Sequence, residues 1–368
     1  MREFSEQELV RRGKVEEIRK FCNPYPEKYE ITHSLKDASN LPDEEKNVSV
    51  AGRIVFMRKM GKLSFLKLRD IEGELQISIK IDLVGEEKYS FFKSNVDVGD
   101  FIGVKGEIFT THTGEKTLRA DDFEFLGKAL KPLPEKFHGL SNIETIYRNR
   151  YVDLIMNEES RTKFLFRSNL IREIRNFLNN NGYIEIETPI LNNKASGALA
   201  KPFITHHNAL DIDLYLRIAP ETYLKRAIVG GFTKVFEFAR CFRNEGIDAT
   251  HLQDFTMLEG YGAYLNYKDN MKFLREMIQT VVMNLFGKLE LTIEGKSIDI
   301  SGEWESISMR DLILKHSNID IYEYNTKEKL LEKIKSEKLE IDSETPLESL
   351  GYGNLVDQLY KKVARPFV

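Results

Sequence analysis

One short segment, RCFRNEGIDATHLQDFTMLEGY at residues 240–261, carries many charged side chains in a pattern that otherwise alternates like a β-strand. A half-buried strand is expected to be apolar on one face, so these charges need an explanation. Arg243 and Glu245 are two residues apart and point the same way if the strand continues. The same spacing places a second set on a shared face: Phe255, Met257, Glu259 and Tyr261.

Such a surface is a poor core but suits a charged ligand with a flat part. The guanidinium of Arg243 can fork onto a phosphate, the ring of Phe255 can stack on a base, and carboxylates can hold an ammonium group. The alternative is that these charges pair with one another on a solvated antiparallel sheet, because structural ion pairs are common. The spacing alone leaves both interpretations open.

The composition bounds the class of protein. A chain of 368 residues suggests two or three domains of about 100–200 residues each. A hydrophobic content of 41% and a charged content of 30% are ordinary for a globular protein, and no apolar run approaches the ~18 residues of a membrane span. The N-terminus has no signal-peptide core, and two cysteines make neither a disulfide framework nor a zinc cluster. We therefore expect a cytoplasmic location without a membrane partner.

The net charge of −4 excludes a surface coated in positive charge for bulk nucleic-acid binding, although a local basic groove is compatible with it. A β-rich block runs from about Val48 to Leu126, with a hairpin turn at 113–116 and a helical segment near 87–94. Five or so short strands in ~80 residues favour a small closed barrel of the OB type. The predicted N-terminal domains are a helical extension at 1–40 and this barrel at 41–130.

The hydrophobic period changes after a proline-containing segment at 131–150, which we predict to be an interdomain linker. The remaining domain, 151–368, begins with a helical stripe and continues with alternating strands and helices. Its predicted strands are 183–188, 214–219 and 234–243, and its predicted helices lie at 170–178, 220–230 and 267–286. The fold class is α+β, with an N-terminal barrel followed by an antiparallel sheet flanked by helices.

The motifs resemble those of a known family. FRNEG (242–246), His251 and FTMLE (255–259) resemble motif 2 of the class II aminoacyl-tRNA synthetases, and NNGYIEIETPIL (180–191) is similar to motif 1. The segment SGALAKPFITHHNALDIDLYLRIAPETYLKR (196–226) resembles the lysine-specific members and separates the chain from aspartyl and asparaginyl relatives. The chain is thereby identified as a member of the bacterial-type class II lysyl-tRNA synthetases.

The resemblance implies ATP-dependent activation of L-lysine with Mg²⁺, transfer to tRNA-Lys, and a homodimer formed through motif 1 at Gly182 and Pro189. The residues that it assigns to ATP are the catalytic Arg243 at the α-phosphate and the lysine carboxylate, Glu245 at the adenine amino group, His251 at the phosphates and Phe255 on the adenine ring. The residues that it assigns to lysine are Gly197, Glu221 and Glu259 at the α-ammonium and Tyr261 at the side-chain end. The alternatives are a helix-capping Glu221, a loop histidine at 251 and a core tyrosine at 261.

In the barrel, the resemblance implies contacts of Arg58, Phe65, Gln76 and Asp122 with anticodon bases. Phe65 would stack on a base while Arg58 and Gln76 bind base edges. From the residues alone, Phe65 is a barrel-core residue. Asp122 stands where the family has a glutamate, and its shorter side chain puts that contact in question.

The sequence also departs from the family pattern. Leu252-Gln253-Asp254 replaces the more usual Asn-Pro-Glu, and Gly260 stands where a bulky residue is usual. Motif 3, with its arginine for the γ-phosphate, the metal ligands and the glutamate for the lysine ε-ammonium, is expected beyond Val368. We therefore expect a C-terminally incomplete lysine–tRNA ligase. The alternative is a truncated paralogue that binds tRNA without catalysis.

Residues 1–368 alone are expected to catalyse little or no lysine-dependent exchange of pyrophosphate into ATP, because the γ-phosphate and metal contacts of motif 3 are missing. Exchange at near-normal rates by this polypeptide would contradict the expectation.

Overall fold

The computed structural model describes residues 3–134, 142–248, 250–341 and 345–367. The chain divides into two compact units, Met1–Ser168 and Asn169–Val368, with the division inside helix α7 (Glu158–Asn180). The linker predicted at 131–150 includes residues 135–141, which lie outside the described residues, so its limits stay a prediction. Within the described ranges, no helix has the length and apolar character needed to cross a membrane.

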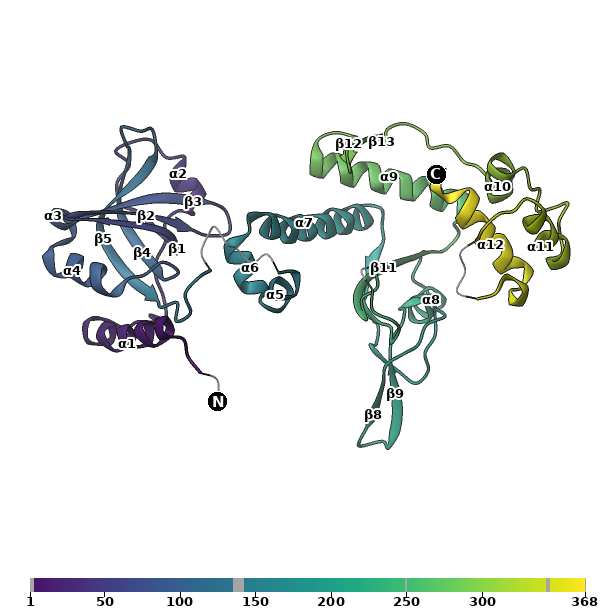
Figure 1. The fold of residues 1–368 in the computed structure, drawn as a ribbon, viewed down its shortest axis with the longest axis horizontal. Helices are drawn as coiled ribbons and strands as arrows, with labels where there is room; N and C mark the ends of the chain where they lie inside the picture. Colours follow the sequence, from purple (N-terminus) through teal and green to yellow (C-terminus); the bar gives the residue numbers. More distant parts are fainter. Residues whose placement is uncertain (1–2, 135–141, 249, 342–344, 368) are drawn as a thin grey trace. The chain divides into compact units, whose positions relative to one another are not determined.

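The first unit contains a closed five-stranded barrel with the strand order β1-β2-β3-β5-β4 (Figure 1). Its strands are β1 (Val48–Met60), β2 (Leu63–Arg69), β3 (Glu74–Lys80), β4 (Phe101–Thr110) and β5 (Lys116–Gly127). Neighbouring strands are antiparallel except β3 and β5, which run parallel. Alternating apolar side chains fill the interior, as the sequence pattern predicts. The predicted OB-type barrel is confirmed.

Short helices surround the barrel: α1 (Glu6–Phe21), α2 (Leu35–Ser39), α3 (Ile81–Val84), α4 (Glu86–Asn95), α5 (Ile143–Arg148) and α6 (Arg150–Met156). The side chain of Ser5 caps α1 by accepting a hydrogen bond from the amide of Glu8. The rings of Phe21 and Phe91 stack with centroids 4.4 Å apart, which attaches α1 to α4. The helical segment predicted near 87–94 is α4.

Gly106 marks a close approach of two backbones in the barrel. A Cβ atom at this position would lie 1.9 Å from the carbonyl oxygen of Arg119, beside a β-bulge between β4 and β5. Gly106→Ala is therefore expected to destabilise the chain by about 1–3 kcal/mol, measured by denaturant unfolding. Gly13→Ala in α1 is the matched control, because nothing lies within 4 Å of that Cβ. It is expected to stabilise by about 0.5–1 kcal/mol, and equal effects of the two changes would contradict the prediction.

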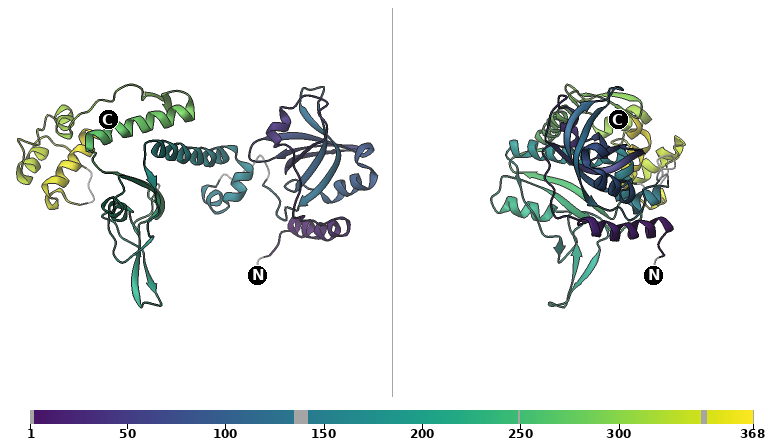
Figure 2. Two further views of the ribbon diagram at one scale, coloured as in Figure 1. Left: turned by 180° about the vertical axis from the view of Figure 1, so that it is seen from behind. Right: turned by 90° about the vertical axis from the view of Figure 1, so that its left-hand side faces the viewer.

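The described residues of the second unit contain two three-stranded sheets and one two-stranded sheet. The first has the order β11-β10-β6 and consists of β6 (Ile184–Glu185), β10 (Lys234–Phe242) and β11 (Asp254–Gly262). The second has the order β7-β9-β8 and consists of β7 (Leu191–Asn192), β8 (Ile204–His207) and β9 (Ile212–Leu216). Strands β8 and β9 form a hairpin that extends away from β10 and β11 in both views along the broad face (Figures 1 and 2).

Helices pack on the first sheet and continue beyond it. They are the end of α7, then α8 (Glu221–Val229), α9 (Tyr267–Phe286), α10 (Met309–Ser317), α11 (Lys327–Ser336) and α12 (Tyr352–Val363), with a hairpin of β12 (Glu290–Ile293) and β13 (Lys296–Asp299). The ring of Phe273 on α9 lies 5.2 Å from the rings of Phe177 and Tyr183, which joins α9 and α7 over Phe236. Helices α10, α11 and α12 share an apolar core of their own.

Most predicted elements of this unit are present with different limits. The helix predicted at 170–178 is α7, which begins at Glu158. The strand predicted at 183–188 is reduced to β6, because the chain soon meets Pro189, which has no amide hydrogen to pair. The strand predicted at 214–219 is β9, which begins at Ile212 and ends at Leu216, so Arg217 lies outside the strand. The predicted helices at 220–230 and 267–286 correspond to α8 and α9.

Candidate active site

The charged segment singled out in the sequence forms a β-hairpin with a long loop. β10 and β11 are paired from Lys234↔Gly262 to Phe242↔Asp254, and the chain leaves the ladder at Arg243. The amide of Arg243 donates to the carbonyl of Gln253 at 2.9 Å, and the amide of Asn244 donates to that of Lys201 at 2.7 Å. The strand predicted at 234–243 is therefore β10, which ends at Phe242, and the continuation that would place Arg243 and Glu245 on one strand face does not occur.

The loop nevertheless gathers the four predicted ATP residues around one cavity of about 230 Å³. Its lining residues are Arg243, Glu245, Gly246, Thr250, His251, Leu252, Gln253 and Phe255. Phe255 belongs to β11, whereas the other lining residues belong to the loop between β10 and β11. The cavity therefore combines cationic, acidic and aromatic groups in one place.

Arg243 is the cation of this cavity. Its guanidinium carbon lies 5.2 Å from the ring centroid of Phe255, which is within cation–π range. Its Nε is buried and has no hydrogen-bond partner among the described residues. A buried donor without an acceptor costs about 1–3 kcal/mol, so the position favours a ligand that supplies an acceptor.

His251 is oriented by an aspartate in the same loop. Its Nδ1 lies 2.7 Å from Oδ2 of Asp248, and its amide donates to Oδ1 at 2.9 Å. Hydrogen bonds from the backbone and hydroxyl of Thr250, and then from His251, hold the pKa of Asp248 far below its usual range. The imidazole is exposed, and His251 is a loop residue that lines the cavity.

An acidic cluster of Glu221, Glu259 and Tyr261 lies further along β11. The hydroxyl of Tyr261 donates to Oε2 of Glu259 at 3.0 Å. Glu221 is the first residue of α8, whose N-cap position is occupied by Pro220, so its carboxylate does not cap the helix. That carboxylate instead accepts a hydrogen bond from Nζ of Lys225 at 2.6 Å, and the same ammonium lies 5.7 Å from the Tyr261 ring centroid.

The environment of the acidic cluster raises the pKa values of Glu259 and Tyr261 on β11. Burial raises the pKa of Glu259, and the nearby Glu221 and Glu237 raise it further, while the hydrogen bond from Tyr261 lowers it. Burial and the contact with Glu259 raise the pKa of Tyr261 well above its usual range. Burial raises the pKa of Cys241 on β10 to about 11, and the charges of Glu259 and Arg243 also act on this thiol. Phe255, which lines the cavity of Arg243 (the arginine cavity), and Glu259 of the acidic cluster both belong to β11, so the two groups of residues meet on one sheet.

Gly197 lies beside the acidic cluster and has a backbone conformation that favours glycine. Its φ is +92°, and a Cβ atom there would lie 3.1 Å from the Cβ atoms of Ala219 and Glu221. The backbone at Gly197 therefore passes directly against the start of α8, next to the Glu221 carboxylate. The structure thus brings Gly197, Glu221, Glu259 and Tyr261 to one region of the second unit.

In the barrel, three predicted anticodon residues lie on the outer face of neighbouring strands. Phe65 on β2 is directly opposite Arg58 on β1, and Gln76 on β3 is opposite Lys67 on β2. Phe65 is half-buried between the buried Ser64 and Leu66, so its ring is outside the barrel core. The amide nitrogen Nε2 of Gln76 donates to Oγ1 of Thr117 at 2.9 Å, which holds its carboxamide in place.

Asp122 has a different environment. It is opposite Lys105 on β4, pairs with Lys88 of α4 and lines a separate cavity with Tyr29 and Glu30. Its predicted contact with a base stays a prediction. Sequence reasoning missed Phe56, a 47% exposed aromatic residue on β1. Phe56 is opposite Lys67 and therefore shares the outer face with Phe65.

The two predicted dimer residues lie at the ends of one connection. Gly182 has φ +78° just after α7, and Pro189 follows β6 on the surface. Two large apolar side chains between or beside them, Ile184 and Ile190, are 51% and 44% exposed. This segment is consequently an exposed, partly apolar surface.

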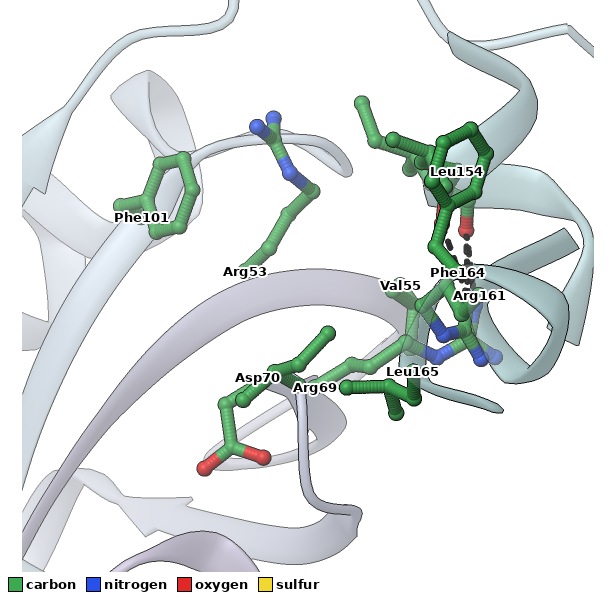
Figure 3. Close-up of a pocket in the computed structure, with 11 residues that line it drawn as sticks. Arg53, Val55, Arg69, Asp70, Phe101, Leu154, Arg161, Phe164 and Leu165 are labelled. Carbon is green, nitrogen blue, oxygen red and sulfur yellow. Dashed lines mark hydrogen bonds between the residues drawn. The ribbon is translucent and has the colours of Figure 1, made fainter. Parts of the chain in front are cut away.

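A more apolar cavity of about 430 Å³ lies in the first unit (Figure 3). Its guanidinium groups are those of Arg53, Arg69 and Arg161, and Phe101 and Phe164 contribute rings. Arg161 donates to the carbonyl oxygens of Leu154 and Ile155, and Arg69 also donates to Ile155. None of the predicted site residues lines this cavity.

Within 3–134, 142–248, 250–341 and 345–367, no group of three or more histidine, cysteine, aspartate or glutamate side chains is arranged to hold a metal ion.

Comparisons with known proteins identify similar sequences. Residues 142–350 match the family described as tRNA synthetases class II (D, K and N), and residues 48–126 match the OB-fold nucleic acid binding domain. The lysine–tRNA ligase of Enterococcus faecalis is 42% identical over 98% of this chain and 73% of its own length. Those of Thermosipho africanus and Clostridium novyi are 43% and 47% identical, over 99% and 91% of this chain and 72% and 66% of their own lengths.

Proposed function

Because this chain belongs to the class II tRNA synthetases (D, K and N), we propose that it is a lysine–tRNA ligase. In this proposal it activates L-lysine with ATP and passes the lysyl group to tRNA-Lys. The observation that carries the proposal is that one sheet brings together the arginine cavity and the acidic cluster, with Phe255 and Glu259 on the same strand. One binds anions and a flat base, and the other binds an ammonium group.

The proposed reaction needs alignment more than proton transfer. A lysine carboxylate is already ionised at neutral pH, so its attack on the α-phosphate requires no general base. The two anions repel each other, and the guanidinium of Arg243, with its unpartnered Nε, can hold both. Phe255 would hold the adenine ring, and Glu245 and His251 would bind its amino group and the phosphates.

The acidic cluster would orient the lysine substrate. Glu221 and Glu259 would receive the α-ammonium beside the backbone of Gly197, and Tyr261 would face the side-chain end. Because ATP carries Mg²⁺ with its phosphates, the family implies the ion as well. The ion would enter with the nucleotide, and no step above depends on a ligand to it from the protein.

Amino-acid choice tests the proposal directly. Calorimetry with non-hydrolysable adenylate analogues of lysine, aspartate and asparagine is expected to show the tightest binding for the lysyl compound. Preference for either of the other two would contradict the lysine assignment while leaving the family unchanged. The expectation that residues 1–368 alone have little activity, and the alternative of a non-catalytic tRNA-binding paralogue, stay predictions that pyrophosphate exchange decides.

The raised pKa of Glu259 predicts the pH dependence of lysine binding. The carboxylate must be ionised to hold the α-ammonium, and burial moves its pKa above the ordinary 4.5. Lysine affinity is therefore expected to fall as the pH decreases through this raised value, earlier than for an exposed glutamate. Calorimetric titration from neutral to mildly acidic pH measures the change. In Glu259→Gln, affinity is expected to be low and nearly independent of pH, and a wild-type acid limb in this variant would contradict the assignment.

The barrel supports a role in anticodon binding. Arg58, Phe65, Gln76 and the newly found Phe56 share one outer face, and single-stranded RNA binds OB folds by stacking on such rings. A homodimer through the 180–191 connection is supported by its exposed isoleucines, and sedimentation of the wild type and Ile184→Glu would test it. A cytoplasmic location follows from a role in translation and also stays a prediction.

A further inference from the structure

Arg217, the residue after β9, is a buried cation outside every predicted contact with ligand. Its side chain and that of its partner Glu237 are each 5% exposed. Nη1 of Arg217 donates to Oε1 of Glu237 at 2.6 Å, and Nε donates to the carbonyl oxygen of Arg240 at 2.7 Å. Because burying an ion pair carries a desolvation penalty, its presence alone says little about stability. What the pair holds in place is more informative.

The same guanidinium reaches a third segment of the chain. Nη1 also lies 2.9 Å from Oγ1 and 3.0 Å from the carbonyl oxygen of Thr188. The hydroxyl of Thr188 in turn donates to Oε2 of Glu237 at 2.6 Å. The backbone of Arg217 adds two bonds: its amide donates to Ile190 at 2.9 Å, and its carbonyl accepts from Phe242 at 2.9 Å. One residue therefore joins the 188–190 segment, the end of β9 and the end of β10.

These bonds lie between the two halves of the candidate site. Phe242, held by the Arg217 carbonyl, immediately precedes Arg243. Four residues after Arg217 in the chain is Glu221, the first residue of α8. Glu237 is directly opposite Glu259 in the β10–β11 ladder, so both side chains are on one face of the sheet. The segments that carry the anion-binding and ammonium-binding groups thus share one anchor.

We propose that Arg217 is a positioning residue that fixes the spacing between Arg243 and the carboxylates of Glu221 and Glu259 and neutralises Glu237 beneath them. This inference rests on the proposed function. It assigns Arg217 no contact with substrate; its effect passes through the backbone at Phe242 and through the charge of Glu237.

The charge of Arg217 predicts a change in the pH dependence of lysine binding, which a loss of packing alone would not produce. The groups that face Glu259 are Tyr261 on its own strand, Glu237 and Cys241 on β10, and Glu221 and Lys225 on α8. Without Arg217, the Glu237 charge acts on Glu259 without compensation, and two close carboxylates disfavour each other's ionisation. Lysine binding would then be lost at a higher pH than in the wild type.

The test compares Arg217→Met with the double variant Arg217→Met/Glu237→Gln in the full chain. L-lysine affinity is measured by calorimetry across pH, and hydrogen exchange of the backbone is followed by mass spectrometry. Arg217→Met is expected to weaken lysine binding at neutral pH by at least about tenfold and to move the acid limb to higher pH. Exchange is expected to quicken together in 186–190 and 240–245. The double variant is expected to recover the wild-type acid limb but not the affinity.

Arg310→Met is the matched control, because it removes an arginine–carboxylate pair with Asp320 in the same unit. It is expected to change neither lysine affinity nor exchange in those two segments. If Arg217→Met does not fold, Arg217→Lys takes its place: it keeps the cation but loses the fork, so affinity is expected to fall with the acid limb unmoved.

Wild-type affinity and acid limb in Arg217→Met, or exchange that quickens evenly over the whole unit, would overturn the proposal. A wild-type chain that binds no lysine would instead refute the proposed function. In that case the exchange measurement alone decides whether Arg217 holds the two segments together.

Discussion

Replacing Arg243 with alanine is expected to weaken binding of a non-hydrolysable lysyl-adenylate analogue by about 100- to 1,000-fold, comparable to the loss of one preorganised donor at an oxyanion. The reason is geometric as well as electrostatic, because the guanidinium is packed near the Phe255 ring and has a buried Nε without a protein acceptor. Calorimetry with the analogue measures the loss. Binding of an RNA hairpin that carries the lysine anticodon is expected to stay unchanged.

Arg240→Ala is the control for this change. Arg240 is on the same β10 strand, but its side chain is half-exposed and pairs with Asp254 outside the cavity. Its removal is expected to leave analogue binding within about twofold of the wild type, because exposed ion pairs contribute little. An Arg243→Ala variant that binds the analogue normally would remove the central role given to this arginine.

Replacing Phe65 with alanine is expected to produce the reverse pattern. One lost stack with a base weakens binding of the anticodon hairpin by about 1–3 kcal/mol, or roughly 5- to 150-fold. Binding of the adenylate analogue is expected to be unaffected, since Phe65 belongs to the barrel and lies outside the barrel core. Fluorescence anisotropy with a labelled hairpin measures the RNA affinity.

Phe101→Ala is the matched control for Phe65, because Phe101 is another barrel phenylalanine that is 40% exposed and lines the cavity of Figure 3 instead. It is expected to bind the hairpin like the wild type. Equal losses in the two variants would mean that barrel stability, and not stacking, controls RNA binding. Phe56→Ala is expected to resemble Phe65→Ala, since both rings share the outer face.

Local patterns in the sequence were sufficient for the barrel and for several helices. The strands of the barrel alternate because each has one face inside, and α9 is bounded by a capping box at Asn266 and a left-handed Gly287. Where the local pattern is interrupted, alternation no longer indicates which face of the strand a residue occupies. The bulge between Ile54 and Phe56 reverses which residues of β1 face inward, so an aromatic residue in an apparently apolar series lies outside.

The site itself was predictable in membership but not in geometry. The alternating series continues through Arg243 and Glu245, so nothing local shows that the strand ends at Phe242; hydrogen bonds to Lys201 and Gln253 decide it. Arg217 lies inside the strand predicted at 214–219, where alternation gives no sign of a buried cation. Its burial depends on Glu237, twenty positions away, and on Thr188 in another segment, which no periodicity reveals.

The contact between Lys225 and Glu221 affects the affinity of the acidic cluster for its proposed substrate. An ammonium group of the protein already lies 2.6 Å from the carboxylate that is proposed to receive the ammonium of lysine. Substrate entry is then an exchange of one cation for another, and the free energy of binding is only the difference between the two. The resident lysine limits affinity, and on product departure it can return to the vacated carboxylate and speed release.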